Sequence, residues 1–343
     1  MEKSILKWAI ICLVLSAVIA YLYHSKRTVK GKEVQGKNNS DNGSKKKEPA
    51  EQLTLFPELD YIAKETLIII GNGFDRAHDI KSSYWDFREW LIKKRDKRLV
   101  DMMDIFFSNQ RDVWSGIEQA LGEYDEKAIL EYCRPDEEFD LDHSLSSSAR
   151  VEDSPNDIFQ PVLEEFKNAF HDWVDSIVID NIDKKYSLDP CCRYLTFNYT
   201  DTLETRYAIP AAQIAHIHGS RLCDDEYVVG HNNHRNPSEA WEEDGIIFEQ
   251  NAHENIIKWM NELTKCYHAN IAKHRAFFDS LRDVKQIITY GHSMANVDWP
   301  YFEEIIKIVG PDVPWRVSCY SKDDIANTKA FMSHFNLTDV TVI

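Results

Sequence analysis

Apolar residues gather in four short runs after residue 65, and each run ends in glycine or in polar residues. The runs span 66–75, 193–201, 214–220 and 286–293. Stretches rich in Ile and Leu that are flanked by polar residues are typical of buried parallel strands. Ligands of open parallel sheets bind outside the carboxyl ends of the strands. The pattern therefore predicts a doubly wound, mostly parallel α/β sheet whose polar strand ends line one crevice.

A helical periodicity separates the first run from the second. Apolar positions recur there at steps of three and four residues, and one such stripe runs over 156–179. We expect a helical insertion at about 82–185 that covers the crevice. The C-terminal third alternates between helix and strand, with segments expected at 254–281, 286–290, 299–308, 315–320, 324–335 and 340–342.

The N-terminal segment differs from everything that follows it. Residues 8–23 carry no charge, and we expect residues 1–24 to form one transmembrane helix. Basic residues are more numerous after this helix than before it, which predicts a membrane anchor with the C-terminal body in the cytoplasm. A cleaved signal peptide is the alternative, but the apolar run continues past Ala20. Residues 25–52 predict a flexible basic linker, which leaves 53–343 as the α/β domain.

Charge is distributed unevenly along the chain. Residues 1–47 hold ten Lys or Arg and three Asp or Glu, a net of +7, so the rest carries −24 of the total of −17. An acidic body repels phosphate backbones, which argues against direct nucleic-acid binding. The seven scattered cysteines lack Cys-x-x-Cys spacing and predict no disulfides in a reducing compartment.

The first run ends in the turn Gly71-Asn72-Gly73, and Asp75 follows two residues later. Glycines at the carboxyl end of a buried strand let a phosphate approach the backbone, but an ordinary tight turn uses the same residues. Asp75 suits either the N-cap of the next helix or an acceptor for a ribose hydroxyl. Asp298, which precedes a Trp-Pro pair, has the same two interpretations.

Two more run ends carry groups suited to chemistry. Asn198 could hold a ribose hydroxyl or a water through its amide, or it could form a turn that caps the next helix. His218 precedes Gly219 and suits a general base near neutral pH. Because His216 falls on the same strand face, spacing alone leaves both histidines open as the base.

Two further patterns argue against other chemistries. The histidines at 231–234, with His253 downstream, have no accompanying Glu or Cys cluster, so they predict a polar loop and no metal site. Residues 291–293 resemble a nucleophile elbow with Ser293 as nucleophile. Only one histidine, His334, follows it, inside a predicted helix, which argues against a serine hydrolase.

The ordered set of motifs resembles the abortive-infection AbiH family of bacterial anti-phage proteins and, more distantly, the sirtuin-like NAD-binding fold. The motifs are Gly-Asn-Gly-Phe-Asp, Phe-Asn-Tyr-Thr-Asp-Thr-Leu-Glu, Ile-His-Gly, and Gly-His-Ser followed by Asp-Trp, within residues 67–343. The sirtuin-like pattern has an Asp at the position of Thr200, whereas this chain has its Asp one place later, at Asp201.

The resemblance implies that the protein binds NAD or a related nucleotide and cleaves its nicotinamide glycosidic bond, with Asn198 and His218 as catalytic residues. The implied cofactor-binding residues are Gly71, Asn72, Gly73, Asp75, Thr196, Thr200, Asp201, Gly219, Gly291, Ser293 and Asp298. The alternative is a nucleotide-binding sensor without turnover, which Thr200 favours. A second copy of the chain and a phage-derived trigger are further partners that the sequence leaves open.

Overall fold

The computed structural model describes residues 53–54, 63–94, 97–107, 113–133, 152–223, 226–239 and 247–343. The expected anchor at 1–24 and the expected linker at 25–52 both lie outside the described residues. Within the described ranges, no helix combines the length and apolar character needed to cross a membrane. The anchor therefore stays a prediction from the sequence.

Six parallel strands form the central sheet. In chain order they are β2 (Thr66–Ile70), β4 (Arg193–Thr196), β5 (Ile214–His216), β6 (Gln286–Tyr290), β7 (Trp315–Val317) and β8 (Val340–Val342). They lie side by side in the order β5-β4-β2-β6-β7-β8, and every pair is parallel. The predicted α/β class with a mostly parallel sheet is confirmed. A separate two-stranded sheet pairs β1 (Leu53–Thr54) with β3 (Tyr186–Ser187).

The order of the strands reverses between β2 and β6. Counted along the chain, the six strands run 3-2-1-4-5-6 across the sheet. This order is typical of dinucleotide-binding domains, in which the ligand lies at the carboxyl ends of the strands where the order reverses. The loops that follow β2 and β6 therefore meet at the position where such a fold binds ligands.

Helices cover both faces of the sheet. Every residue of β2 is buried, and since successive side chains of a strand point to opposite faces, both faces must be covered. Leu67 and Ile69 belong to one core, which includes residues of α12 (Arg275–Asp279), α13 (Trp299–Val309) and α14 (Lys322–Phe335). Ile68 and Ile70 belong to a second core with α2 (Asn72–Ala77) and α9 (Thr202–Thr205). The polar tips of the strands extend beyond these two cores.

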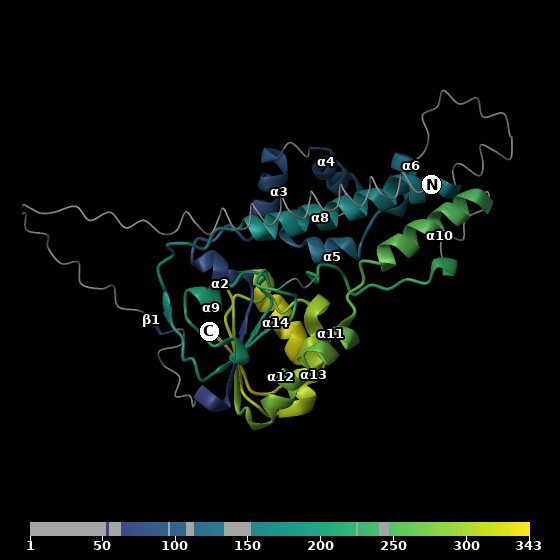
Figure 1. Ribbon diagram of the computed structural model, residues 1–343. Helices are drawn as coiled ribbons and strands as arrows, with labels where there is room; N and C mark the ends of the chain where they lie inside the picture. Colours follow the sequence, from purple (N-terminus) through teal and green to yellow (C-terminus); the bar gives the residue numbers. More distant parts are fainter. Residues whose placement is uncertain are drawn as a thin grey trace, which may run out of the picture. The chain divides into compact units, whose positions relative to one another are not determined.

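A group of helices, here called the helical layer, has its own core. It comprises α3 (Tyr84–Lys93), α4 (Lys97–Phe106), α5 (Ile117–Leu121), α6 (Glu126–Cys133), the π-helix η3 (Pro155–Phe159), α8 (Gln160–Ser176) and α10 (Ile247–Asn261). Figure 1 shows α3, α4 and α8 grouped together, and contacts join α10 to α6 and η3. Phe87 of α3 packs against Phe166, Phe170 and Trp173 of α8. Tyr199, just beyond β4, also packs against this core.

The prediction of one helix over 254–281 is wrong. The helix α10 ends at Asn261, and α11 (Tyr267–Lys273) and α12 follow as separate helices. The reason is a bridge across the break: the His231 N–H donates to Leu263 O at 3.0 Å, and the Lys265 N–H donates to His231 O at 2.9 Å. Gly230 permits this approach, since a Cβ there would lie 2.0 Å from Leu263 O. The break directs α10 into the helical layer instead of onto the sheet.

Candidate functional site

The glycine turn after β2 packs against the loop after β6. The Gly71 N–H donates to Tyr290 O at 3.0 Å, and the Gly73 N–H donates to Gly291 O at 2.8 Å. A Cβ on Gly71 would lie 2.5 Å from Gly291 O. Gly291 has a φ of +66°, a conformation that glycine adopts without strain. These glycines therefore let two backbones touch at the strand-order reversal, and the Gly73 amide is already engaged by the protein.

Asp75 is buried inside α2 and does not cap it. The N-cap position is Gly71, and only 1% of Asp75 is exposed. Its carboxylate accepts hydrogen bonds from Thr200 Oγ1 at 2.5 Å and from Thr202 Oγ1 at 3.0 Å. Burial raises the pKa of Asp75 to about 6, although these hydroxyls act to lower it. The carboxylate thus joins the first motif to the second, and the capping interpretation was wrong.

Asn198 lies beside this carboxylate at the tip of β4. A side-chain hydrogen bond from Asn198 also acts to lower the pKa of Asp75. Because a carboxylate only accepts hydrogen bonds, the Asn198 amide nitrogen is the donor. The Asn198 amide oxygen is buried and has no hydrogen-bond partner among the described residues. A buried acceptor without a partner is energetically costly unless something else donates to it.

The neighbours of Asn198 have structural partners. The buried Thr196 hydroxyl accepts the Asn198 N–H at 3.1 Å. Asp201 forms an ion pair with Arg221, whose guanidinium also donates to the carbonyl of Ile177 just after α8. Asp201 therefore ties the strand tip to the helical layer.

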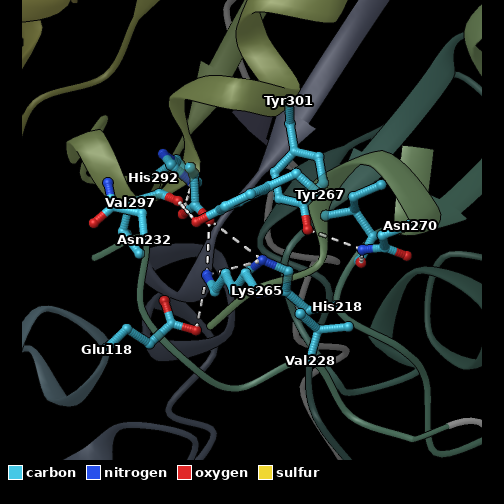
Figure 2. Close-up of polar contacts among 12 residues, drawn as sticks. Glu118, His218, Val228, Asn232, Lys265, Tyr267, Asn270, His292, Val297 and Tyr301 are labelled. Atoms are coloured by element: carbon cyan, nitrogen blue, oxygen red, sulfur yellow. Dashed lines mark hydrogen bonds and ion pairs between the residues drawn. The ribbon is translucent and has the colours of Figure 1, made fainter. Parts of the chain in front are cut away.

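A second polar cluster contains His218, Lys265, Asp298, His292 and Glu118. Lys265 Nζ lies 3.0 Å from Asp298 Oδ1, 3.0 Å from Glu118 Oε1 and 3.3 Å from His218 Nε2. Asp298 Oδ1 is 3.3 Å from His218 Nε2, and Asp298 Oδ2 is 3.3 Å from His292 Nε2. Figure 2 shows Lys265 between Glu118 and His218, with Tyr267 and Tyr301 nearby. We call these five residues the lysine cluster.

Separate parts of the fold supply the lysine cluster. His218 follows β5, and Gly219 after it has a φ of +92° that turns the chain. Asp298 occupies the predicted N-cap position of α13, with Pro300 in the first turn, but its side chain makes no capping hydrogen bond and turns to the lysine cluster instead. Glu118 lies on α5 of the helical layer. The cluster therefore joins this layer to the carboxyl edge of the sheet.

The charges of the lysine cluster stabilise one another. Burial opposes the ammonium form of Lys265, but Asp298 and Glu118 outweigh burial and raise the pKa of Lys265 above its ordinary range. Burial likewise opposes the carboxylate of Asp298, but Lys265, and beside it the His292 imidazole, hold the pKa of Asp298 well below its ordinary value. The buried pair is therefore ionised at neutral pH. Removing one partner of such a pair leaves an uncompensated buried charge.

The two histidines that spacing left open have different surroundings. His216 Nε2 lies 2.7 Å from Glu204 Oε1, and its Nδ1 lies 3.1 Å from the carbonyl oxygen of Asn198. His218 is 4% exposed and belongs to the lysine cluster. Phe197 packs on His218 with ring centroids 5.0 Å apart. His218 therefore belongs to the lysine cluster, whereas His216 contacts the backbone of Asn198.

In the motif after β6, the histidine and the serine differ in position. Ser293 is exposed, and its carbonyl accepts a hydrogen bond from Asn327 at 3.1 Å. His292, which sequence reasoning passed over, is buried in the lysine cluster. The sequence also gave no signal for Glu118 or Lys265. Their residue types are common on helices, and only the tertiary fold brings them to the strand tips.

The side chains of Glu118, His218 and Asp298 offer metal-ligating atoms within 4.8 Å of one another. Lys265 Nζ already lies among these atoms, so an added cation would have to displace a buried ammonium. His231, singled out in the sequence, instead pairs through Nε2 with Met260 O at 2.9 Å and supports the chain break before Lys265. Lysine is thus the cation that the described residues supply to this site.

The fold places the chain among α/β proteins with a parallel sheet, and polar residues follow the carboxyl ends of its strands. The family model described as bacteriophage abortive infection AbiH matches residues 67–319, and the chain belongs to this family. Membership supports a role in abortive infection against bacteriophage. Comparisons with curated proteins and with solved structures gave no match.

Proposed function

We propose that this abortive-infection protein binds NAD or a related nucleotide at the carboxyl edge of its sheet, and that an N-terminal helix anchors it to the bacterial inner membrane with the α/β domain in the cytoplasm. The observation that carries the binding proposal is the Asn198 amide oxygen, a buried acceptor without a partner among the described residues. A ribose hydroxyl would supply the missing donor. The strand order supports the same location.

The proposed reaction is hydrolysis of the nicotinamide glycosidic bond. Water forms a bond to the anomeric carbon, the carbon–nitrogen bond breaks, and nicotinamide leaves as a neutral molecule with the electron pair of that bond. The proton of the attacking water passes to a base, which in this proposal is His218. Positive charge develops on the ribose as the bond breaks, so the Asn198 amide oxygen would stabilise the transition state electrostatically.

The remaining proposed contacts follow the strand tips. The turn at Gly71, Asn72 and Gly73 would face the diphosphate. Because the Gly73 N–H already donates to Gly291 O, this turn would contribute shape and the remaining backbone rather than that amide. Gly291 and Ser293 would support the adenosine ribose. The carboxylate of Asp75 would act through Asn198, by fixing which end of the amide faces the ligand.

One observation favours the second candidate, a nucleotide-binding sensor without turnover. Lys265 Nζ lies 3.3 Å from Nε2 of His218, so a cation already occupies one nitrogen of the proposed base. A base that accepts a proton beside an ammonium pays an electrostatic penalty. The sensor would bind the same nucleotide at the same strand tips and signal through its anchor or through a partner.

Nicotinamide release separates the two candidates. The full chain is incubated with NAD, and release is followed for wild type, Asn198→Ala and His218→Ala. His171→Ala is the matched histidine control, because His171 is exposed on α8 and lies there beside Asp175. Loss of release in the first two variants but not in the control supports hydrolysis. Binding without release in wild type supports the sensor, and release that survives both substitutions refutes the assignment of Asn198 and His218.

A further inference from the structure

The lysine cluster contains a residue whose role neither the motifs nor the family assigns. We propose that Lys265 is a positioning residue that fixes the tautomer of His218, so that His218 presents an N–H group at Nδ1. The consequence of this tautomer for ligand binding rests on the proposed function. The tautomer itself, set by a buried lysine, does not depend on whether the protein turns over a nucleotide.

The backbone of Lys265 is held firmly. Lys265 follows the break after α10, where its N–H donates to His231 O and Thr264 forms a parallel bridge with His231. His231 is itself fully buried. The side chain of Lys265 is 0% exposed. A buried ammonium on an anchored backbone has few alternative positions, so it donates its hydrogen bonds to the same neighbouring atoms.

Three side-chain atoms surround the Lys265 ammonium. The Asp298 contact is a hydrogen bond of 3.0 Å, and the Glu118 contact at 3.0 Å is an ion pair that lacks hydrogen-bond alignment. The third neighbour is His218 Nε2 at 3.3 Å. An ammonium has three donors and no acceptor, whereas a neutral imidazole carries one donor and one acceptor nitrogen. The His218 nitrogen that faces Lys265 is therefore the acceptor, and the proton lies on Nδ1.

The opposite tautomer has a poorer environment. An N–H at His218 Nε2 would point toward Asp298 Oδ1, which is also 3.3 Å away. That oxygen already accepts from Lys265, while His292 Nε2 lies 3.3 Å from the second oxygen of Asp298. The same N–H would also lie 3.3 Å from the Lys265 ammonium. Two donors would then face each other in a buried site, which is electrostatically unfavourable.

This arrangement changes what His218 offers a ligand. With its proton on Nδ1, His218 donates to an acceptor atom, such as a carboxamide or phosphate oxygen, and does not accept a proton from water. For His218 to act as a base, Lys265 must first withdraw from Nε2. Because Glu118 lies on α5, the position of Lys265 also depends on how the helical layer docks.

The test is the ring-nitrogen NMR spectrum of the full chain labelled with ¹⁵N at its histidines and recorded without nucleotide. His218→Gln assigns the resonances. For wild type we expect a neutral His218 with the proton on Nδ1. For Lys265→Met we expect the proton to move to Nε2, where Asp298 accepts it. Lys258→Met, an exposed lysine of α10, is the control and should leave the tautomer unchanged.

Lys265→Met alone leaves the buried carboxylate of Asp298 and the half-buried carboxylate of Glu118 without this cation, so the double variant with Glu118→Gln is measured beside it. A wild-type His218 with its proton on Nε2 overturns the proposal, whatever the variants do. An Nδ1 proton that persists after Lys265 is removed overturns it too. In the double variant we also expect NAD to bind on the order of tenfold more weakly, since Nδ1 of His218 has changed from a hydrogen-bond donor to an acceptor. Failure of NAD binding in wild type would refute the proposed function and leave the tautomer result standing.

Discussion

Asp75 gives the chain a pH-dependent stability with a defined sign. Its pKa is about 6 in the folded protein against an ordinary value of 3.8. Below about pH 3.8 the carboxyl is protonated in both states and has no effect. As the pH rises toward about 6, only the unfolded chain loses this proton, so the folded state loses stability. Above that pH both states are ionised and the penalty stays constant.

The size of the effect follows from the shift. A rise from 3.8 to about 6 corresponds to roughly 3 kcal/mol, at about 1.4 kcal/mol per pKa unit. The perturbation is Asp75→Asn, which removes the titrating group and keeps the size of the side chain. We expect the free energy of unfolding of wild type, relative to this variant, to fall by roughly 3 kcal/mol between about pH 4 and pH 7.

Urea unfolding of the full chain, followed by tryptophan fluorescence across this pH range, measures the difference. Thr200→Val serves as a second variant, because it removes a hydrogen bond that lowers the pKa of Asp75. The loss of stability should then extend to higher pH. A difference between wild type and Asp75→Asn that stays flat with pH, or that grows as the pH rises, would refute the reasoning.

Two more predictions concern the packing of the strand tips and the buried ion pair. The substitution Gly310→Ala introduces only backbone strain, because Gly310 has a φ of +93° and an added Cβ would have no atom within 4 Å. We expect urea unfolding to show a loss of about 1–3 kcal/mol in the free energy of unfolding. Gly291→Ala should lose more, because its Cβ would lie 2.4 Å from the Phe74 nitrogen; equal losses would contradict the close approach of the two loops. Lys265→Met should destabilise the protein by about 3–5 kcal/mol. The exposed Lys307→Met should cost less than about 1 kcal/mol, and similar losses in both lysine variants would contradict a buried ion pair at Lys265.

The sheet could be predicted from the sequence because each strand is a short apolar run bounded by polar residues or glycine. The run that contains β2 is the clearest case, since all five of its residues are buried. The helix predicted over 254–281 failed because periodicity does not register a bridge between segments distant in the chain. That bridge, at His231 and Thr264, interrupts the helix and brings Lys265 into the site.

The candidate site was only partly visible in the sequence. The motifs drew attention to Asp75, His218 and Asp298, three buried polar residues in the segments that follow β2, β5 and β6. The structure overturns the capping interpretation of Asp75, and it confirms the N-cap position of Asp298 while directing its carboxylate elsewhere, because the partners of both carboxylates come from other segments. Asp75 is satisfied by Thr200, and Asp298 by Lys265. Such long-range partners leave no periodic signal in the sequence.

The most direct test of the account is calorimetric titration of the full chain with NAD, for wild type and for Asn198→Ala. Asn255→Ala, on α10 of the helical layer, is the matched control. The account predicts saturable binding to wild type and to the control, and binding weaker by at least about tenfold in Asn198→Ala, because the unpartnered acceptor is lost. No binding of NAD by wild type, or equal binding by Asn198→Ala, would contradict the claim that this strand tip is a nucleotide site.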